Sequence, residues 1–200
     1  MAIAPEITKA LEAYDPRAQI SPFQMRLIMG VVAQHRFAAR FLIHGCGLDS
    51  PFWHRLNAHG RTLFVETDEA WVRAIRVLAP DLQVTGYPDL PTTVAQGEAE
   101  VDADALARAP LPEWAKEAWD LVLIDGPVGY EPQHPGRALP IFWAADALQS
   151  NADIFVDDYQ RPLERLHCDT LLRTADQGCA ILPGNAGRLM FWRMGRPGAA

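Results

Sequence analysis

Acidic residues follow several short apolar runs in this sequence, and each run has the composition of a buried strand. Glu66 ends the run TLFVE, Asp125 follows LVLI, and Asp157 and Asp158 follow DIFV. Carboxylates that converge on one place can bind a cation or move a proton, because unpaired carboxylates repel one another and are costly to bury. These residues are therefore the first candidates for chemistry.

A glycine-containing loop, GCGLDS, follows the apolar run FLIH. Gly45 and Gly47 stand where glycines after the first strand of a parallel sheet let the backbone approach a ligand. The third glycine of the phosphate-binding GxGxxG pattern is missing, and Asp49 would repel a pyrophosphate but can face an ammonium group. Glu66 follows about 20 residues later, where an acid takes ribose hydroxyls. The combination favours S-adenosylmethionine, with NAD as the main rival.

The acids after the later strands offer oxygen ligands for a hard cation. Asp125, Asp157 and Asp158 are the predicted ligands of a divalent metal, Mg²⁺, Mn²⁺ or Co²⁺, and also the predicted catalytic carboxylates. Asp125 is in addition a candidate cofactor contact. As an alternative, one residue of the Asp157–Asp158 pair caps the helix that follows.

The segment GYEPQHPGR is a loop rich in proline and glycine, and it supplies candidate substrate contacts. Arg137 at its end, and Arg161 further on, can each present a guanidinium to a carboxylate. For Arg161, salt bridges to the neighbouring aspartates are an equal alternative. Tyr130 is a further candidate for substrate binding. His134 is a candidate base, although a single histidine in such a loop is more often only exposed.

Short apolar runs alternate with helical periodicity, which predicts a parallel sheet whose strand ends share one edge. The fold expected is α/β and Rossmann-like, a doubly wound, mostly parallel seven-stranded sheet with a C-terminal antiparallel hairpin and two N-terminal helices. One domain covers residues 1–200, with a helical addition at 1–40 and the core at 41–194; residues 96–112 form a surface excursion. Strands are predicted at Phe41–His44, Thr62–Glu66, Leu82–Thr85, Asp120–Asp125, Asp153–Asp157, Cys179–Leu182 and Arg188–Arg193. Helices are predicted at Pro5–Ala18, Ser21–Arg40, Pro51–Ala58, Glu69–Leu78, Arg137–Gln149 and Arg161–Ala175.

Composition narrows the classes of partner. The 200 residues carry a net charge of −7 and no run of basic residues, which argues against a nucleic-acid surface. We expect no membrane association and a cytoplasmic location, because the sequence contains neither an apolar run of membrane-spanning length nor a secretory signal pattern. The three cysteines are widely spaced and are expected to be reduced. The oligomeric state stays open, with a homodimer through the N-terminal helices as one option.

Three blocks of the sequence together resemble a known enzyme family. The blocks HGCGLDSPFWHRLNAHGRTLFVETDEAW, WDLVLIDGPVGYEPQHPGR and DIFVDDYQRPLE are similar, in order and spacing, to the glucuronoxylan 4-O-methyltransferase family, which includes arabinogalactan methyltransferases. The similarity covers roughly residues 41–173. It implies methyl transfer from S-adenosylmethionine to the 4-hydroxyl of glucuronic acid, assisted by a divalent metal.

The resemblance also implies roles for individual positions. The residues that match the cofactor part of the family's motifs are Gly45, Gly47 and Asp49 in the cofactor loop, Glu66 at the ribose, and Asp125 at the aspartate of the DAPTGY-type motif. Gly136 and Arg137 match the PGR of the substrate loop, and Asp158 and Arg161 match the last block. Asp157 replaces a histidine of that block and Gln160 an aspartate. These departures leave the acceptor open, and a free sugar, a nucleotide sugar or another small acid is an alternative to the polymer.

Two other activities compete with this hypothesis. A metal-dependent methyltransferase for a catechol or an amino acid is the main alternative, because such enzymes also place carboxylates after the fourth and fifth strands. An NAD-linked oxidoreductase would need a pair such as Tyr–Lys, and neither Lys9 nor Lys116 lies near a tyrosine at a strand end. The expected function is therefore methylation of a uronic acid saccharide by S-adenosylmethionine.

Overall fold

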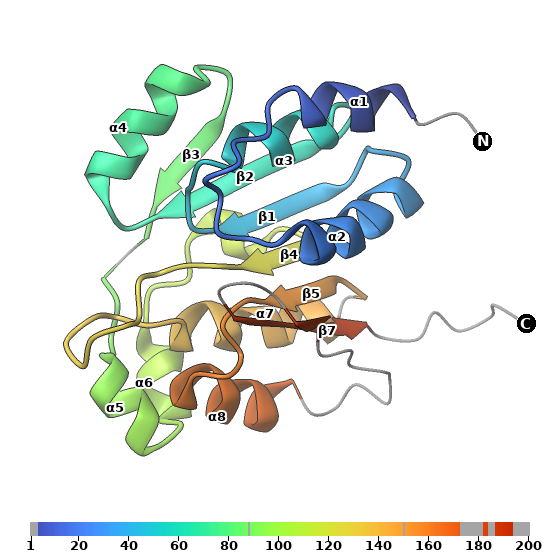
Figure 1. The fold of residues 1–200 in the computed structure, drawn as a ribbon. Helices are drawn as coiled ribbons and strands as arrows, with labels where there is room; N and C mark the ends of the chain where they lie inside the picture. Colours follow the sequence, from blue (N-terminus) through green and yellow to red (C-terminus); the bar gives the residue numbers. More distant parts are fainter. Residues whose placement is uncertain (1–3, 88, 150, 173–181, 184–186, 194–200) are drawn as a thin grey trace, which may run out of the picture.

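The computed structural model describes residues 4–87, 89–149, 151–172, 182–183 and 187–193. One twisted sheet runs through it, with strands in the order β3-β2-β1-β4-β5-β7-β6 (Figure 1). Strands β1 to β5 are parallel, and β7 runs antiparallel to β5. The strands are β1 Arg40–His44, β2 Arg61–Glu66, β3 Gln83–Gly86, β4 Leu121–Ile124, β5 Asp153–Val156, β6 Leu182–Pro183 and β7 Arg188–Arg193. This arrangement confirms the Rossmann-like order predicted from the sequence.

The seventh strand is much smaller than expected. Six strands have four or more residues, whereas β6 has two and pairs only with β7, so the hairpin is a short antiparallel edge. The rest of the predicted strand Cys179–Leu182 lies outside the described residues.

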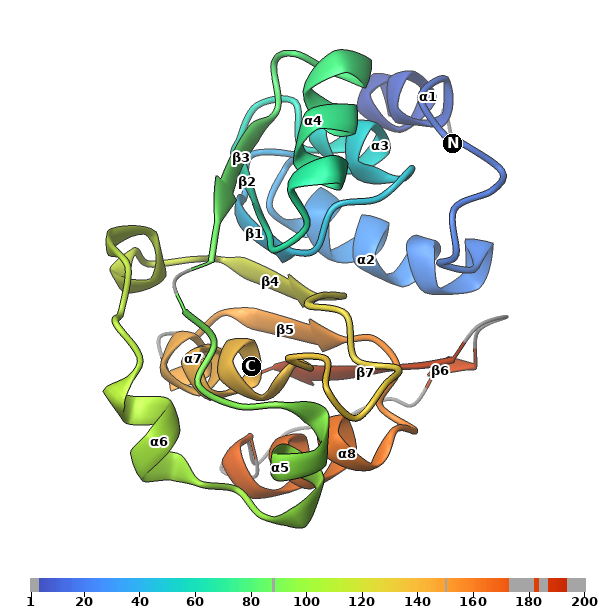
Figure 2. The same ribbon diagram turned by 90° about the vertical axis from the view of Figure 1, so that its left-hand side faces the viewer.

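Helices cover both faces of the sheet (Figures 1 and 2). One side carries α1 Pro5–Leu11, α2 Pro22–Gln34, α3 Ser50–Leu56 and α4 Glu69–Leu78. The other side carries α5 Val94–Ala99, α6 Ala103–Arg108, the 3₁₀ helix η1 Glu113–Lys116, α7 Ala138–Gln149 and α8 Pro162–Leu171. None of the helices within these described ranges is long and apolar enough to cross a membrane.

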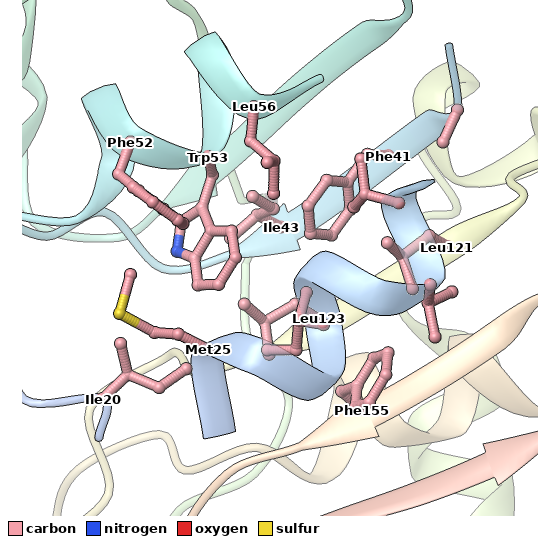
Figure 3. Close-up of a cluster of buried hydrophobic side chains, with 14 of the residues drawn as sticks. Ile20, Met25, Phe41, Ile43, Phe52, Trp53, Leu56, Leu121, Leu123 and Phe155 are labelled. Atoms are coloured by element: carbon pink, nitrogen blue, oxygen red, sulfur yellow. The ribbon is translucent and has the colours of Figure 1, made fainter. Parts of the chain in front are cut away.

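The alternation of side chains along the strands builds two cores. Phe41 and Ile43 point to the face covered by α2 and α3, and Leu42 points to the opposite face. Figure 3 shows the first core, in which Trp53 of α3 and Met25 of α2 lie over the strands. Because apolar side chains on both faces are removed from water, burial fixes the strand register and therefore the positions of the strand ends.

Helix boundaries differ from the predictions where the chain changes direction. The first helix ends at Leu11. The second ends at Gln34, because Arg36 and Phe37 just beyond it have left-handed φ angles of 55° and 59°. The segment predicted as a surface excursion contains the short helices α5 and α6, each with a side-chain cap, from Thr93 and from Asp102. These caps satisfy the N–H groups that a short helix leaves unpaired.

Candidate active site

The glycine loop lies at the carboxyl edge of the sheet, against the loop after β4. The main-chain N–H of Asp125 donates to the carbonyl of His44 at 2.9 Å, which extends the β1–β4 pairing beyond the strands. Gly45 has φ of 108°, and a Cβ there would lie 3.1 Å from the main-chain N of Gly126. A Cβ on Gly126 would in turn lie 2.8 Å from the Cα of Gly45. The close approach of the two loops therefore requires glycine on both sides.

Glu66 at the end of β2 holds the same loop from the other side. Its carboxylate accepts hydrogen bonds from the main-chain N–H groups of Cys46 at 2.7 Å, Thr67 at 2.6 Å and Asp68 at 2.8 Å. The side chain is nearly buried, so it stays in one orientation. The predicted acid thus lies beside the glycine loop, and it fixes the loop through Cys46.

A cleft of about 620 Å³ opens next to Glu66, between the ends of β2 and β3. Gly86, Tyr87 and Leu90 are among its lining residues. The hydroxyl of Tyr87 forms a hydrogen bond with Nδ1 of His44, and the His44 ring is fully buried. The volume lies in the usual range for small-molecule sites. Neither Tyr87 nor His44 was among the sequence candidates, although both stand at strand ends.

Arg137 lies at the centre of the predicted acidic set. Its Nη2 atom is 3.2 Å from Oδ1 of Asp125 and 3.0 Å from Oδ2 of Asp158, and it donates to the main-chain oxygen of Asp125 at 2.9 Å. Nη1 donates to the main-chain oxygen of Asp157. Only 5% of the Arg137 side chain is exposed. The guanidinium therefore connects the loop after β4 with the loop after β5.

This position corrects two expectations. Arg137 was expected to present its charge to a substrate, but its side chain is buried and paired. Asp125, Asp157 and Asp158 were expected to hold a metal, yet no group of three His, Cys, Asp or Glu residues in the described part of the chain is arranged to hold one. The guanidinium supplies the positive charge that the metal was expected to supply, so these residues do not fit a metal centre.

The pKa values of Asp125 and Asp157 are both raised. Loss of water contact around Asp125, together with the charge of Asp157, raises the pKa of Asp125 well above its usual value, although 39% of its side chain is exposed. Burial also raises the pKa of Asp157, against the opposing effects of Arg137 and of a hydrogen bond with Asp125. Two adjacent carboxyl groups with raised pKa values can share and transfer a proton.

Asp49 adds a partly buried carboxyl group within the glycine loop. Its Oδ2 accepts a hydrogen bond from Nε1 of Trp53 at 2.8 Å. Burial raises the pKa of Asp49, and the charge of Asp157 acts in the same direction. The loop predicted to contact a cofactor thus carries a carboxyl group that forms no ion pair with the described residues.

Asp158 has a structural position next to this pair. It adopts a left-handed φ of 57°, and its Oδ2 is 2.7 Å from Nη2 of Arg161. Gln160 donates to its Oδ1 at 3.1 Å. The salt bridge considered as the alternative for Arg161 is therefore present. Neither aspartate caps α8, whose N-cap residue is Arg161.

The loop after β4 holds the two remaining candidates away from this cluster. Tyr130 is 72% exposed and packs edge-on against His134, with ring centroids 4.5 Å apart. Nδ1 of His134 accepts a hydrogen bond from the main-chain N–H of Glu131 at 3.1 Å. Its main-chain oxygen accepts from Val94 of α5 at 2.8 Å. The contacts of His134 are thus with its own loop and α5, and it remains a predicted base that no observation supports.

Comparison with curated proteins gives relatives that include two kinds of plant polysaccharide methyltransferase. The chain is 34% identical over 145 residues to glucuronoxylan 4-O-methyltransferase 1 of Arabidopsis thaliana. The matched region covers 62% of this chain and 51% of that protein. It is 29% identical over 166 residues to arabinogalactan O-methyltransferase 2 of the same plant, covering 70% of this chain and 57% of that protein. The chain thus spans about half the length of the curated relatives it matches.

Among solved structures, the O-methyltransferase TomG from Streptomyces achromogenes, in complex with SAM, has a similar fold. The TM-score is 0.53 at 15% identity, over 97% of this chain and 92% of that chain. The family model described as IRX15/IRX15L/GXM matches residues 23–88 and 88–177, which are most of the sequence. The protein therefore belongs to the IRX15/IRX15L/GXM family.

Proposed function

We propose that this protein is an O-methyltransferase that uses S-adenosylmethionine to methylate the 4-hydroxyl of a glucuronic acid residue. The observation that carries the proposal is the excess of carboxyl groups around the glycine loop. Asp49, Glu66, Asp125 and Asp157 lie there, and the buried Arg137 pairs with Asp125 of this set. S-adenosylmethionine brings an ammonium and a sulfonium to such a site, whereas the pyrophosphate of NAD would be repelled.

The cleft beside Glu66 suits the adenosine part of this cofactor. Oε1 of Glu66 already accepts three hydrogen bonds from Thr67 and Asp68, whereas Oε2 accepts one, from the main-chain N–H of Cys46. Oε2 is therefore the oxygen that can also take a ribose hydroxyl. The adenine ring would then lie toward Tyr87 and Leu90 at the end of β3. The methionine part would extend along Gly45 and Gly47 toward Asp49.

Methyl transfer needs alignment of three atoms and a group that takes a proton. The acceptor oxygen attacks the methyl carbon in line with the departing sulfur, and S-adenosylhomocysteine leaves as a neutral thioether. The acceptor hydroxyl loses its proton as the new C–O bond forms. Asp157, paired with Asp125 at the edge of the glycine loop, is the proposed proton acceptor.

The acceptor class rests on the relatives, which are named for glucuronoxylan and arabinogalactan. Both are polysaccharides, and the family resemblance points to their uronic acid units. Arg161, with 30% of its side chain exposed beside Asp158, is the proposed contact for a uronate carboxylate. Tyr130 offers an exposed ring in the loop after β4.

A transfer assay tests this function. The protein is incubated with S-adenosylmethionine and a xylo-oligosaccharide that carries glucuronic acid, and the product is analysed by mass spectrometry. We expect one added methyl group on the uronic acid and no product from the unsubstituted oligosaccharide. Methylation of a catechol instead, with none of the uronic acid, would refute the acceptor and favour the small-molecule alternative.

A further inference from the structure

The start of β7 lies against the loop that follows β5. In the antiparallel register Met190 is opposite Val156, so Arg188, two residues earlier, is level with the first residues after β5. The main-chain oxygen of Arg188 accepts the N–H of Tyr159 at 3.0 Å. Side chains alternate along a strand, so Arg188 lies on the same face of the sheet as Met190, the face that α8 covers. β7 therefore places an arginine at the carboxyl edge of the parallel strands.

The side-chain amide of Gln160 fixes this arrangement. Its Oε1 accepts the main-chain N–H of Arg188 at 2.6 Å, and its Nε2 donates to Oδ1 of Asp158 at 3.1 Å. A carboxylate at position 160 can accept but not donate, so an amide is needed for both contacts. A Cβ on Gly187 would lie 2.6 Å from the same Oδ1, so a residue without a side chain lets the strand approach this closely.

Asp158 compensates the charges of two neighbouring arginines. Its Oδ2 is 3.0 Å from Nη2 of Arg137 and 2.7 Å from Nη2 of Arg161. Arg137 is buried, whereas 30% of the Arg161 side chain is exposed. Arg188 is exposed and forms no salt bridge with another described residue. Its guanidinium is thus a positive charge at this edge that no described carboxylate compensates.

An anionic group that binds at this edge needs such a charge. A uronate carboxylate meets the negative charges of Asp157 and Asp158, which stand in the loop after β5. An uncompensated guanidinium offsets that repulsion and offers two parallel N–H donors to the carboxylate. Arg161 alone offers only the donors that its pair with Asp158 leaves free.

We propose that Arg188 binds the carboxylate of the uronic acid unit beside Arg161, and that Gln160 is a positioning residue for Arg188. The inference rests on the proposed function and deepens it, because it assigns recognition of the acceptor's charge to the C-terminal hairpin. Gln160 acts through the main chain of Arg188 and is not itself expected to touch the acceptor.

The substitution Arg188→Gln tests the carboxylate contact. The acceptors are a xylo-oligosaccharide that carries glucuronic acid and the uronate methyl ester of the same oligosaccharide. We expect Arg188→Gln to raise the KM for the uronate at least fivefold, with kcat within twofold of wild type, and to leave the KM for the ester unchanged. Arg108→Gln is the matched control, because Arg108 is also exposed and forms no salt bridge with the described residues. A wild-type KM for the uronate in Arg188→Gln would overturn the inference.

A double-mutant cycle tests the positioning role of Gln160. Gln160→Leu removes both hydrogen bonds and should raise the KM for the uronate about threefold in the wild-type background. In the Arg188→Gln background the same substitution should add nothing, because the side chain that Gln160 positions is then absent. The same threefold effect in both backgrounds would overturn the positioning role.

A binding measurement separates this inference from the proposed function. Calorimetry with the uronate oligosaccharide is carried out in the presence of S-adenosylhomocysteine, so that no methyl transfer is needed. If wild type binds the oligosaccharide through Arg188 but methylates nothing, the proposed function fails and the inference stands. Equal binding by wild type and Arg188→Gln, or no binding by either, would overturn the inference.

The cofactor also carries a carboxylate, so its affinity must be measured beside that of the acceptor. We expect the Kd for S-adenosylmethionine in Arg188→Gln to stay within twofold of wild type. A weaker cofactor with acceptor binding kept would assign Arg188 to the methionine carboxylate and overturn the inference.

Discussion

Nη2 of Arg137 lies 3.0 Å from Oδ2 of Asp158, and only 5% and 8% of the two side chains are exposed. The same nitrogen reaches Asp125, so one buried guanidinium compensates carboxylates from two loops. The carboxyl edge of the sheet is thus held together by an internal cation.

Replacement of Arg137 by an uncharged residue should lower the stability of the folded protein. In Arg137→Met, uncompensated carboxylates stay buried, and we expect a loss of roughly 3 to 5 kcal/mol in the free energy of unfolding. The loss should be smaller at pH 5 than at pH 8, because protonation relieves the repulsion. Urea unfolding at both pH values measures it. Arg165→Met is the control, since the Arg165–Asp169 pair is largely exposed and should matter by less than about 1 kcal/mol. Equal stability of both variants would contradict this interpretation of Arg137.

The glycine loop gives a second prediction. Gly45→Ala places a Cβ against Gly126 at a φ of 108°, so it should lower stability and weaken S-adenosylmethionine binding at least tenfold. Gly30→Ala in α2 is the matched control, because nothing lies within 4 Å of its Cβ. It should raise stability by roughly 0.5 to 1 kcal/mol and leave binding unchanged. Thermal unfolding and calorimetry of the two variants decide the point.

Glu66 gives a third prediction. In Glu66→Gln an amide replaces one acceptor oxygen, so either the N–H of Cys46 or the N–H groups of Thr67 and Asp68 lose their acceptor. We expect S-adenosylmethionine to bind at least tenfold more weakly, or about 1.4 kcal/mol. Glu98→Gln on the exposed surface of α5 should bind normally. Unchanged affinity in Glu66→Gln would show that the cofactor lies elsewhere.

The buried histidine of β1 predicts a pH effect. Burial lowers the pKa of His44 from 6.5 to about 3, so the folded state keeps the ring neutral while the unfolded chain takes up a proton below pH 6.5. The unfolded state then binds more protons, and stability falls as the pH falls from 6.5 toward 3, with a slope of up to about 1.4 kcal/mol per pH unit. In His44→Phe this contribution should vanish. Denaturation curves from pH 6 to pH 4 with the same slope in both proteins would contradict the prediction.

The acidic set also predicts how cofactor binding responds to chelation. Since Arg137 fills the place expected for a metal, treatment with EDTA should leave the Kd for S-adenosylmethionine unchanged. Calorimetry before and after chelation, with Mg²⁺ or Mn²⁺ added back, measures this. A loss of affinity that the metal restores would reinstate a metal at Asp125, Asp157 or Asp158.

Much of the fold could be predicted from the sequence because it depends on local patterns. The apolar runs give β1, β2, β4 and β5 within one or two residues, and Ser21-Pro22 marks the start of α2. The acids at the strand ends were found for the same reason. The partnership of Arg137 with Asp125 and Asp158 was missed, because an ion pair between two loops depends on how far each loop folds back.

Contacts between distant segments account for the other omissions. Arg188 lies 28 residues from Gln160, and its local pattern indicates only a strand. His44 and Tyr87 meet because β1 and β3 end on one edge of the sheet with β2 between them, and their side chains lie on one face. Such pairings require the three-dimensional register, which periodicity alone does not supply.

Isothermal titration calorimetry of the protein with S-adenosylmethionine, and separately with NAD and NADPH, tests the central claim most directly. We expect saturable binding of S-adenosylmethionine in the micromolar range, equivalent to about −8 kcal/mol, and no binding of either dinucleotide. Glu66→Gln should reduce the S-adenosylmethionine signal. Binding of a dinucleotide, or no heat with S-adenosylmethionine, would contradict the assignment of the glycine loop and its carboxyl groups to a cationic cofactor.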